Sequence, residues 1–310
     1  MEKPVIRISV RNLVEFILRN GDLESGGTAG DKEAMLKGSR LHRKIQKQMG
    51  SHYQAEVSLK KDTEYEDLIL RVEGRADGIF TQNEKICIDE IKGVYKNLEL
   101  LAEPVLVHRA QALCYAWIYL DDHGLEEIDV QMTYAHLDTE MIKRFRETMT
   151  REELESWYQR LLDSYHKWLS YQMKWREERN RSMEKLEFPF TYRKGQKEMV
   201  AGIYHAISRK EQIFIQAPTG VGKTMSAVFP AVRSIGEGKA ETLFYLTART
   251  ITRTVAQDAF EILRKNGLLF KTVTITAKEK LCFCEKPECN PETCPYAKGH
   301  YDRINDAVYE

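Results

Sequence analysis

Two carboxylates and a lysine in the first third of the chain have a spacing that suits phosphodiester hydrolysis. Asp77 lies in the run GRADG, and Glu90 and Lys92 lie in the run IDEIK, with twelve residues between Asp77 and Glu90. Such hydrolysis needs carboxylates to hold a hard divalent cation and a further group to orient or deprotonate water. The spacing suits a hairpin in which Asp77 and Glu90 ligate one Mg²⁺ or Mn²⁺ ion and Lys92, on the same strand face as Glu90, points at the phosphate. Each piece alone also suits a solvated hairpin.

A second run, APTGVGKT at 217–224, has the composition of a phosphate-binding loop. It follows an apolar stretch that reads as a strand and precedes a helical pattern, which is the context such a loop requires. Glycines let backbone N–H groups approach the β-phosphate, while Lys223 reaches the β- and γ-phosphates and Thr224 ligates Mg²⁺. The predicted site for ATP with Mg²⁺ consists of Ala217, Pro218, Thr219, Gly220, Val221, Gly222, Lys223 and Thr224.

Four of the six cysteines, Cys282, Cys284, Cys289 and Cys294, lie within thirteen residues. Four thiolates are enough to ligate a [4Fe–4S] cluster, and zinc is the alternative because spacing alone does not separate the metals. The N-terminus has no secretory signal, so we expect a cytoplasmic protein in which a disulfide pair is disfavoured. Cys87 and Cys114 lie in apolar surroundings and are expected to be packing residues.

The elements that must position these residues fall into two sets. In the first half the pattern predicts helices at 5–20, 31–49 and 104–120, and strands at 52–59, 68–73, 76–81, 86–91 and 128–134. In the second half, helices at 195–209, 224–235 and 251–266 alternate with strands at 212–216, 241–246 and 271–275, which indicates a parallel sheet. The expected fold class is therefore α/β.

A long charged helix over 151–181 joins the two sets. Leu154, Leu161, Trp168 and Trp175 recur every seven residues, which suits packing on the first domain or a short coiled coil. The run FPF at 188–190 breaks the helix. We expect a nuclease-like domain at 1–150, a connector at 151–187, a nucleotide-binding lobe at 188–277 and a cysteine-containing domain from 278 to 310.

Charge gives no general signal for nucleic acid, since 47 basic residues balance 47 acidic ones. Any DNA contact is expected to be local, in a groove rather than across a basic face. The sequence has no apolar run near the ~20 residues of a membrane span, so no membrane partner is expected. The oligomeric state is not predicted.

Flanking motifs extend the first site. GSRLH at 38–42 precedes it and HRAQALCY at 108–115 follows it. Together, G-x-x-x-H, G-R-x-D, E-x-K and Q-x-x-x-Y over residues 5–135 resemble RecB-type PD-(D/E)xK nucleases, which implies a restriction-endonuclease-like core. The resemblance makes His42, Asp77, Glu90 and the Ile91 carbonyl the metal ligands and Lys92 the catalytic lysine. It further implies that Gln111 and Tyr115 position the DNA strand and that Glu56 supports the site.

The second half resembles a superfamily 2 helicase of the DinG/XPD-like branch. YRKGQ at 192–196 is similar to the adenine-reading element, with Gln196 facing the base, although a solvated glutamine at a helix start would look the same. LTART at 246–250 is similar to the motif that grips a single-stranded backbone, here through Thr247 and Arg249. In that branch a cluster domain interrupts the first RecA-like lobe. The tight C-x-C pair departs from the usual spacing, so either Cys282 or Cys284 is a candidate bystander.

These resemblances imply an ATP-dependent DNA helicase with an N-terminal metal-dependent nuclease, acting on single-stranded DNA in repair or processing. No D-E-x-H sequence follows Thr224. We therefore expect a fragment, truncated inside the cluster domain, that binds ATP without hydrolysing it. The alternatives are a non-catalytic module that holds single strands for the motor, and a redox or iron sensor built around the cysteines.

Overall fold

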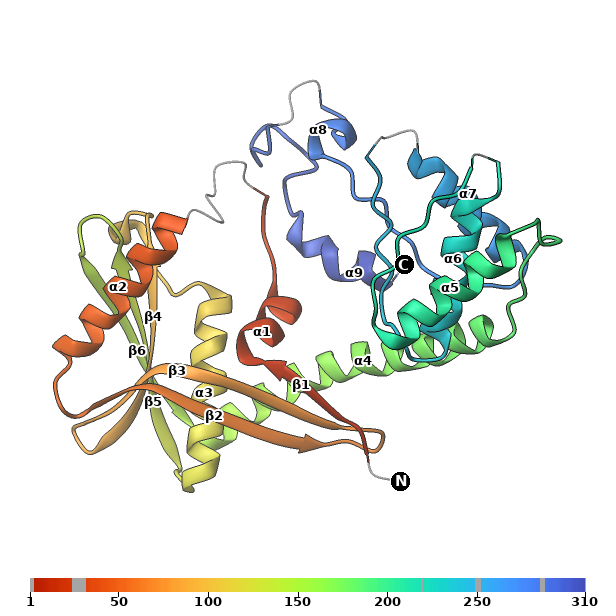
Figure 1. Ribbon diagram of the computed structural model, residues 1–310. Helices are drawn as coiled ribbons and strands as arrows, with labels where there is room; N and C mark the ends of the chain where they lie inside the picture. The colour runs from red at the N-terminus through yellow and green to blue at the C-terminus, as the bar shows by residue number, and fades with distance from the viewer. Residues whose placement is uncertain (1–2, 24–31, 219, 249–251, 285–287, 310) are drawn as a thin grey trace. The chain divides into compact units, whose positions relative to one another are not determined.

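The structure, a computed structural model, describes residues 3–23, 32–218, 220–248, 252–284 and 288–309 (Figure 1). The chain divides into two compact units: residues 1–166 with 277–310 form the first, and residues 167–276 form the second. The expected Thr219 and Arg249 lie outside the described residues. None of the helices in the described ranges is long and apolar enough to cross a membrane.

The first unit is built on a mixed sheet. Its elements are β1 (Val5–Ser9), α1 (Val10–Leu18), α2 (Lys32–Gln48), β2 (Tyr53–Glu64), β3 (Ile69–Gln82), β4 (Lys85–Val94), α3 (Leu106–His123), β5 (Glu127–His136) and β6 (Ile142–Thr150). The described strands run in the order β1-β3-β4-β5-β6, with β2 paired to β3. The β1–β3 and β4–β5 pairs are parallel, and the other pairs are antiparallel.

Two helices cover opposite faces of the central strands (Figure 1). Leu41 and Ile45 of α2 pack on Ile91 of β4. The helix α3 lies on the other face. Lys92, the next residue of β4, donates a hydrogen bond there to Gln111 of α3. Successive residues of a strand point to opposite sides, so β4 offers one face to each helix. This explains why the middle of β4 is buried without a break.

The first part of α4 (Arg151–Glu184) packs within the first unit. Leu154, Tyr158 and Leu161 are buried, and the Tyr158 ring lies 6.1 Å from that of Trp117 on α3. Of the two interpretations of the seven-residue apolar pattern, packing on the first domain is the one that the structure supports. The predicted helix is confirmed, and it continues into the second unit.

Three expectations for the first half were wrong. The two strands expected at 68–73 and 76–81 are one continuous strand, β3. Residues 5–9 begin a strand rather than a helix, because they pair in parallel with Ile69 and its successors in β3. The strand β6 was missed because its sequence, IKRFRETMT, alternates exposed charged residues with partly buried ones at the sheet edge. Edge strands carry charge to resist pairing with other chains, and this weakens the hydrophobic signal from which strands are predicted.

The second unit contains α5 (Gln196–Arg209), α6 (Lys223–Gly236) and α7 (Thr252–Lys265), close to the predicted helices. Its core consists of Met183, Leu186, Met225, Val228, Phe229, Val232, Ile235, Ala259, Phe260, Leu263 and Leu268. Arg233 of α6 donates to the carbonyl oxygens of Met183 and Leu186, at 3.3 and 3.4 Å. The end of α4 and α6 are thereby joined.

The three strands predicted for a parallel sheet in this half were wrong. In the described part of the second unit, residues 212–216, 241–246 and 271–275 form no strand. Their apolar side chains face solvent: Phe214 is 93% exposed, Leu246 88% and Ile275 88%. Parallel strands normally require cover on both faces. A hydrophobic pattern indicates only that a segment tends to be buried. These segments lack the cover that would bury them, so they do not form the predicted strands.

The segment after the cysteines packs on the end of α1. Leu23 N donates to Ala297 O at 2.9 Å, and Tyr301 N donates to Gly21 O at 2.9 Å. Ala297 is 1% exposed. Residues 297–303 therefore belong to the first unit, where they lie against the chain that leads from α1 toward α2.

Candidate active site and nucleotide-binding loop

Asp77 lies on β3 at a break in its pairing with β2. Ala55 pairs with Gly78 and Val57 pairs with Ala76, so Glu56 is the residue that faces Asp77, and the register is the same on both sides. Glu56 has a φ of 58°, in the left-handed region that non-glycine residues rarely adopt. The irregular backbone of β2 therefore lies opposite the residue that the sequence assigns to metal binding.

The carboxylate of Asp77 faces both its own sheet and α2. Its Oδ2 accepts the Ile91 N–H at 2.7 Å, and its Oδ1 lies 3.7 Å from His42 Nδ1. The predicted hairpin is confirmed, since β3 and β4 are antiparallel with Gly78 opposite Asp89. Asp77 is thereby placed next to Glu90. The predicted residues His42, Asp77, Glu90 and Ile91 are brought together.

Glu90 is a buried acid with one oxygen unpaired. Its Oε1 lies 2.8 Å from Lys92 Nζ, whereas its Oε2 has no hydrogen-bond partner among the described residues. Burial raises the pKa of Glu90 to about 7; Lys92 opposes this rise and the charge of Asp77 adds to it. A buried carboxylate oxygen without a partner is costly. Glu90 therefore presents an acceptor that a cation would satisfy.

Gln111 and Tyr115 lie behind the site rather than on an open surface. Lys92 Nζ donates to Gln111 Oε1 at 2.6 Å, and Gln111 is 4% exposed. Tyr115 packs against Gly74, where an added Cβ would lie 2.7 Å from its hydroxyl oxygen. Burial raises the pKa of Tyr115, and the backbone of Arg75 hydrogen-bonds to it. These two residues therefore contact Lys92 and the strand that leads to Asp77.

Two supporting groups were missed in the sequence. Gln46 lies one turn after His42, and its Nε2 donates to Asp77 O at 2.9 Å and to Glu56 Oε1 at 3.2 Å. Asp89 is a buried residue of β4 that accepts hydrogen bonds from Tyr53, Thr133 and Gln131. The i, i+4 spacing from His42 was a usable signal for Gln46. Asp89 gave none, because it lies on the face of β4 opposite to Glu90 and Lys92 and belongs to none of the motifs.

The residues at this site fit a divalent cation only in part. Among the described residues, no group of three or more His, Cys, Asp and Glu side chains is arranged to hold a metal ion. Lys92 occupies Glu90 Oε1, and the Ile91 N–H occupies Asp77 Oδ2. The donors that fit are the unpaired Glu90 Oε2 and the Asp77 Oδ1 that faces His42. These are hard oxygen donors, of the kind that Mg²⁺ and Mn²⁺ prefer.

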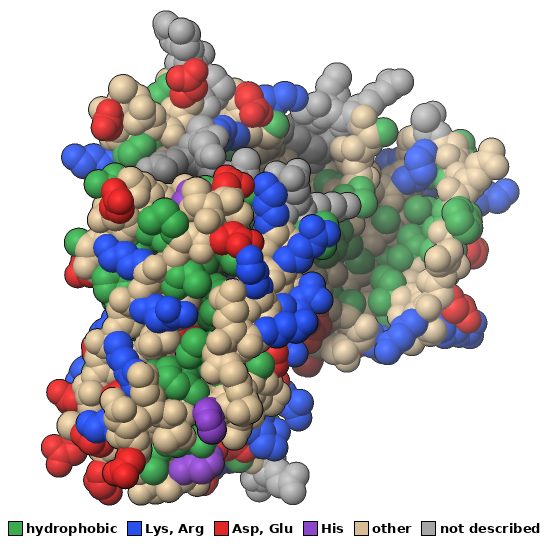
Figure 2. Space-filling view, turned by 90° about the vertical axis from the view of Figure 1, so that its left-hand side faces the viewer, with side chains coloured by type: hydrophobic (Ala, Val, Ile, Leu, Met, Phe, Trp, Pro, Cys, Tyr) green, Lys and Arg blue, Asp and Glu red, His purple; other side chains and the backbone are tan. Residues whose placement is uncertain are grey.

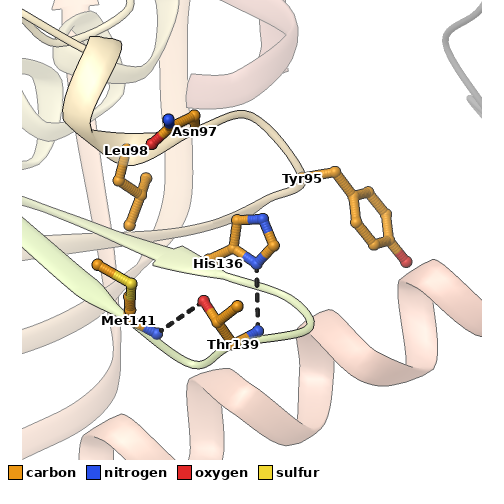
Figure 3. A pocket seen from close by; sticks show the side chains of 6 residues that line it. All are labelled: Tyr95, Asn97, Leu98, His136, Thr139 and Met141. Atoms are coloured by element: carbon orange, nitrogen blue, oxygen red, sulfur yellow. Dashed lines mark hydrogen bonds between the residues drawn. The ribbon is translucent and has the colours of Figure 1, made fainter.

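A small pocket of about 280 Å³ opens beyond the ends of β4 and β5 (Figure 3). Tyr95, Asn97, Leu98, His136, Thr139 and Met141 line it. His136 Nδ1 accepts the N–H groups of Asp138 and Thr139, each at 3.2 Å, so the other ring nitrogen is the one that carries a proton. Tyr95 and Asn97, which line this pocket, follow Lys92 in the chain just after the end of β4. No motif in the sequence indicated the pocket.

The phosphate-binding loop precedes α6 as predicted. Gly222 is the residue before the helix and has a φ of 76°, while Thr224 lies in the first turn. Lys223 Nζ donates to the loop's own Ala217 O and Pro218 O, at 3.0 and 2.8 Å. The lysine therefore closes over the loop in which phosphates would bind.

Gln196 is buried against this loop rather than solvated. Its Nε2 donates to Val221 O at 3.1 Å, and its Oε1 accepts the Arg193 N–H at 3.0 Å. A Cβ on Gly222 would lie 2.6 Å from Gln196 Nε2, so an alanine at this position would displace the Gln196 amide. Thr247, from the predicted backbone-gripping motif, is exposed.

The cysteine segment brings some of its thiols together. Cys284 Sγ and Cys294 Sγ are 3.9 Å apart, and the interaction with Cys294 raises the pKa of Cys284 to about 11. Backbone N–H groups of Ala297 and Tyr296 lower the pKa of Cys294. Cys282 also hydrogen-bonds to Cys284, and Lys278 Nζ donates to Cys289 Sγ at 3.5 Å. The separation of Cys284 and Cys294 exceeds the ~2.05 Å of a disulfide, so both are free thiols.

Comparison with known proteins identifies one part of the chain. Residues 193–285 match the family model of DEAD/DEAH box helicases. This range contains Gln196 and the phosphate-binding loop, and its similarity to these helicases supports an ATP-binding and nucleic-acid-binding role for this segment. No curated protein matches the sequence. Among 16 matching chains of solved structures, "Crystal structure of SSO0001" is 20% identical, with a TM-score of 0.35, over 50% of this chain and 75% of that chain.

Proposed function

We propose that the first unit is a Mg²⁺- or Mn²⁺-dependent DNA nuclease, joined to a helicase segment of the DinG/XPD-like type. The proposed substrate is single-stranded DNA, and the proposed role is DNA repair or processing. The observation that carries the proposal is the buried Glu90, whose Oε2 lacks a partner in the described structure and whose pKa is raised to about 7 beside Asp77. Two neighbouring carboxylates repel each other when both are ionised, and a cation bound between them would relieve that repulsion.

Asp77, Glu90, His42 and the Ile91 carbonyl would hold the ion. When bound, a divalent cation polarises a phosphate oxygen and lowers the pKa of a water molecule. Lys92 is held by Glu90 at 2.8 Å and by Gln111 at 2.6 Å, which limits its positions. Its ammonium group is placed to donate a hydrogen bond to a phosphate oxygen and to stabilise the charge that develops there.

Gln111 and Tyr115 act as positioning residues in this proposal. Because both are buried, their effect on DNA would pass through Lys92 and through the strand that carries Asp77. Gln111 fixes the lysine side chain, and Tyr115 packs on Gly74 three residues before Asp77. Preorganised support of this kind keeps catalytic groups in place before the substrate arrives.

For the helicase segment we propose ATP with Mg²⁺ at Gln196 and residues 217–224, and single-stranded DNA at Thr247 and Arg249. A [4Fe–4S] cluster is proposed at Cys282, Cys284, Cys289 and Cys294, with zinc as the rival metal. Support for the cluster comes from the approach of Cys284 and Cys294 to 3.9 Å and from the lowered pKa of Cys294, because thiolates are the ligands of such clusters.

Cleavage of end-labelled single-stranded DNA by the full chain tests the nuclease. We expect cleavage with Mg²⁺ or Mn²⁺, none in EDTA, and loss of at least about a hundredfold in Asp77→Ala and Lys92→Ala. Asp62→Ala and Lys60→Ala change the same residue types on β2, away from the site, and should cleave like the parent. Equal cleavage by the Asp77 and Lys92 variants would show that the site is wrongly assigned. DNA binding without any cleavage by the parent would favour the non-catalytic module.

A further inference from the structure

The helix α2 carries a stripe of four cations on one face. Arg40, Arg43, Lys44 and Lys47 are exposed and together border an open hollow of about 420 Å³. The helix has six Lys and Arg residues and one Glu, although the whole chain is electrically neutral. Lys and Arg side chains are prominent on the side of the molecule that Figure 2 shows, the side on which α2 lies in Figure 1. We call these four residues the α2 stripe.

The α2 stripe lies beside the candidate active site. At 3.6 residues per turn it covers about 100° of the helix, and His42 is about 100° from its edge at Arg43. His42 and Gln46 occupy the neighbouring face, which contacts Asp77. A strand bound along the stripe would therefore lie on the face of α2 next to the one that faces the metal ligands.

Most of this positive charge is not neutralised by the described residues. Lys44 pairs with Glu140, and Arg43 Nε donates to the Ser39 carbonyl at 3.2 Å within its own helix. In the part of the chain that the structure describes, Arg40, Arg43 and Lys47 form no ion pair with a carboxylate. Exposed like charges at this spacing repel one another, which a bound polyanion would relieve.

We propose that the α2 stripe binds the phosphodiester backbone of a nucleic-acid strand and leads it to Asp77 and Glu90. This inference rests on the proposed nuclease. From Arg40 to Lys47 the helix rises about 10 Å, a length over which one strand of a duplex passes about three phosphates. Two arginines supply forked donors that match phosphate oxygens, and two lysines supply point charges. Contacts of these cations with phosphates carry no sequence information, so we expect the stripe to bind strands of any sequence.

Binding of a fluorescent single-stranded oligonucleotide to the full chain, measured in EDTA over a range of salt, tests the stripe. Arg43→Gln/Lys47→Gln should bind about tenfold more weakly at 50 mM salt and lower the slope of log affinity against log salt by about 1.4. Arg7→Gln/Lys60→Gln removes the same charge from exposed positions on β1 and β2 and should bind like the parent. Arg43→Lys/Lys47→Arg keeps the charge and should retain the slope.

The outcomes separate the stripe from the nuclease. If the parent cleaves DNA while the Arg43/Lys47 variant binds with unchanged affinity and slope, the stripe is wrong and the nuclease stands. If the variant loses binding and the parent does not cleave, the nuclease is wrong and the stripe stands. If polyglutamate of matched charge competes as well as the oligonucleotide, the surface fits an acidic polypeptide, and its assignment to nucleic acid is overturned.

Discussion

The side-chain amide of Gln46 donates a hydrogen bond to the backbone carbonyl oxygen of Asp77 at 2.9 Å. The same amide donates to Glu56 Oε1 at 3.2 Å, on the residue of β2 that faces Asp77. One turn earlier on α2, His42 approaches the Asp77 carboxylate at 3.7 Å. α2 thus contacts both the backbone carbonyl and the side-chain carboxylate of Asp77. The position of Asp77 therefore depends on this helix.

Replacing Gln46 should weaken the site without removing any proposed ligand. Gln46→Leu removes the donor to a buried carbonyl and should lower the free energy of unfolding by about 1–3 kcal/mol, measured in urea. We further expect the Mg²⁺ concentration for half-maximal cleavage to rise several-fold, with a smaller change at saturating Mg²⁺. Gln48→Leu, at an exposed position of the same helix, is the control. A Gln46 variant with the parent's Mg²⁺ dependence would show that the contact positions nothing.

His108 should make the first unit sensitive to acid. Burial lowers the pKa of His108 to about 4, with smaller contributions from Lys92 and Arg11. Its Nδ1 lies 3.1 Å from the Tyr134 hydroxyl, which accepts the Val105 N–H and so has its proton available for the imidazole. The neutral ring is therefore the form that fits the folded structure.

Because the unfolded histidine titrates near pH 6.5, the folded state binds fewer protons than the unfolded state between pH 6.5 and 4. The stability linked to His108 is fully present above pH 6.5 and is lost as the pH falls through 4. The loss amounts to about 3 kcal/mol at most. His108→Gln should flatten the fall in unfolding free energy over this range, and His52→Gln, at an exposed site, should leave it unchanged. Identical pH profiles for parent and His108→Gln would refute the assignment.

The phosphate-binding loop offers a matched pair of glycine substitutions. Gly222→Ala brings a Cβ to 2.6 Å from Gln196 Nε2, whereas Gly238→Ala, at a similar φ of 71°, meets nothing within 4 Å. Both should cost about 1–2 kcal/mol of stability for the left-handed backbone. Only Gly222→Ala should also weaken ATP binding, by about tenfold or more, as Lys223→Ala should. Fluorescent-nucleotide titrations would measure this, and equal ATP affinity in the two alanine variants would contradict a role for the Gln196 contact.

The sequence predicted those parts of the structure that leave a local signature. The hairpin that joins Asp77 to Glu90, the helix that carries Gln111 and the loop before α6 follow from spacing and periodicity. The contact of Ala297 with Leu23 could not be predicted, because it joins residues far apart in the chain that share no motif. The prediction of three strands in the second unit was wrong for a related reason. Whether Phe214 is buried depends on what covers it, and hydrophobicity does not reveal that.

The cysteine segment supplies the last prediction. The described residues between 278 and 296 contain little regular structure beyond the short α8 (Lys278–Leu281), and a metal is the most direct way to order such a loop. Anaerobically purified protein should be brown, with iron and sulfide each near about four per chain if a full cluster forms. Colourless protein with stoichiometric zinc would favour the rival metal.

Serine substitutions should then separate ligands from bystanders. Cys294 has a lowered pKa because backbone N–H groups of Ala297 and Tyr296 stabilise its thiolate, so Cys294→Ser should lose the metal most completely. Cys289→Ser should lose it as well. Cys284 lies 3.9 Å from Cys294, which makes Cys282 the better candidate for the member of the C-x-C pair that can be replaced without loss. Metal content that stays unchanged in all four variants would remove the cysteines from metal binding, and with them the most specific support for the DinG/XPD-like branch.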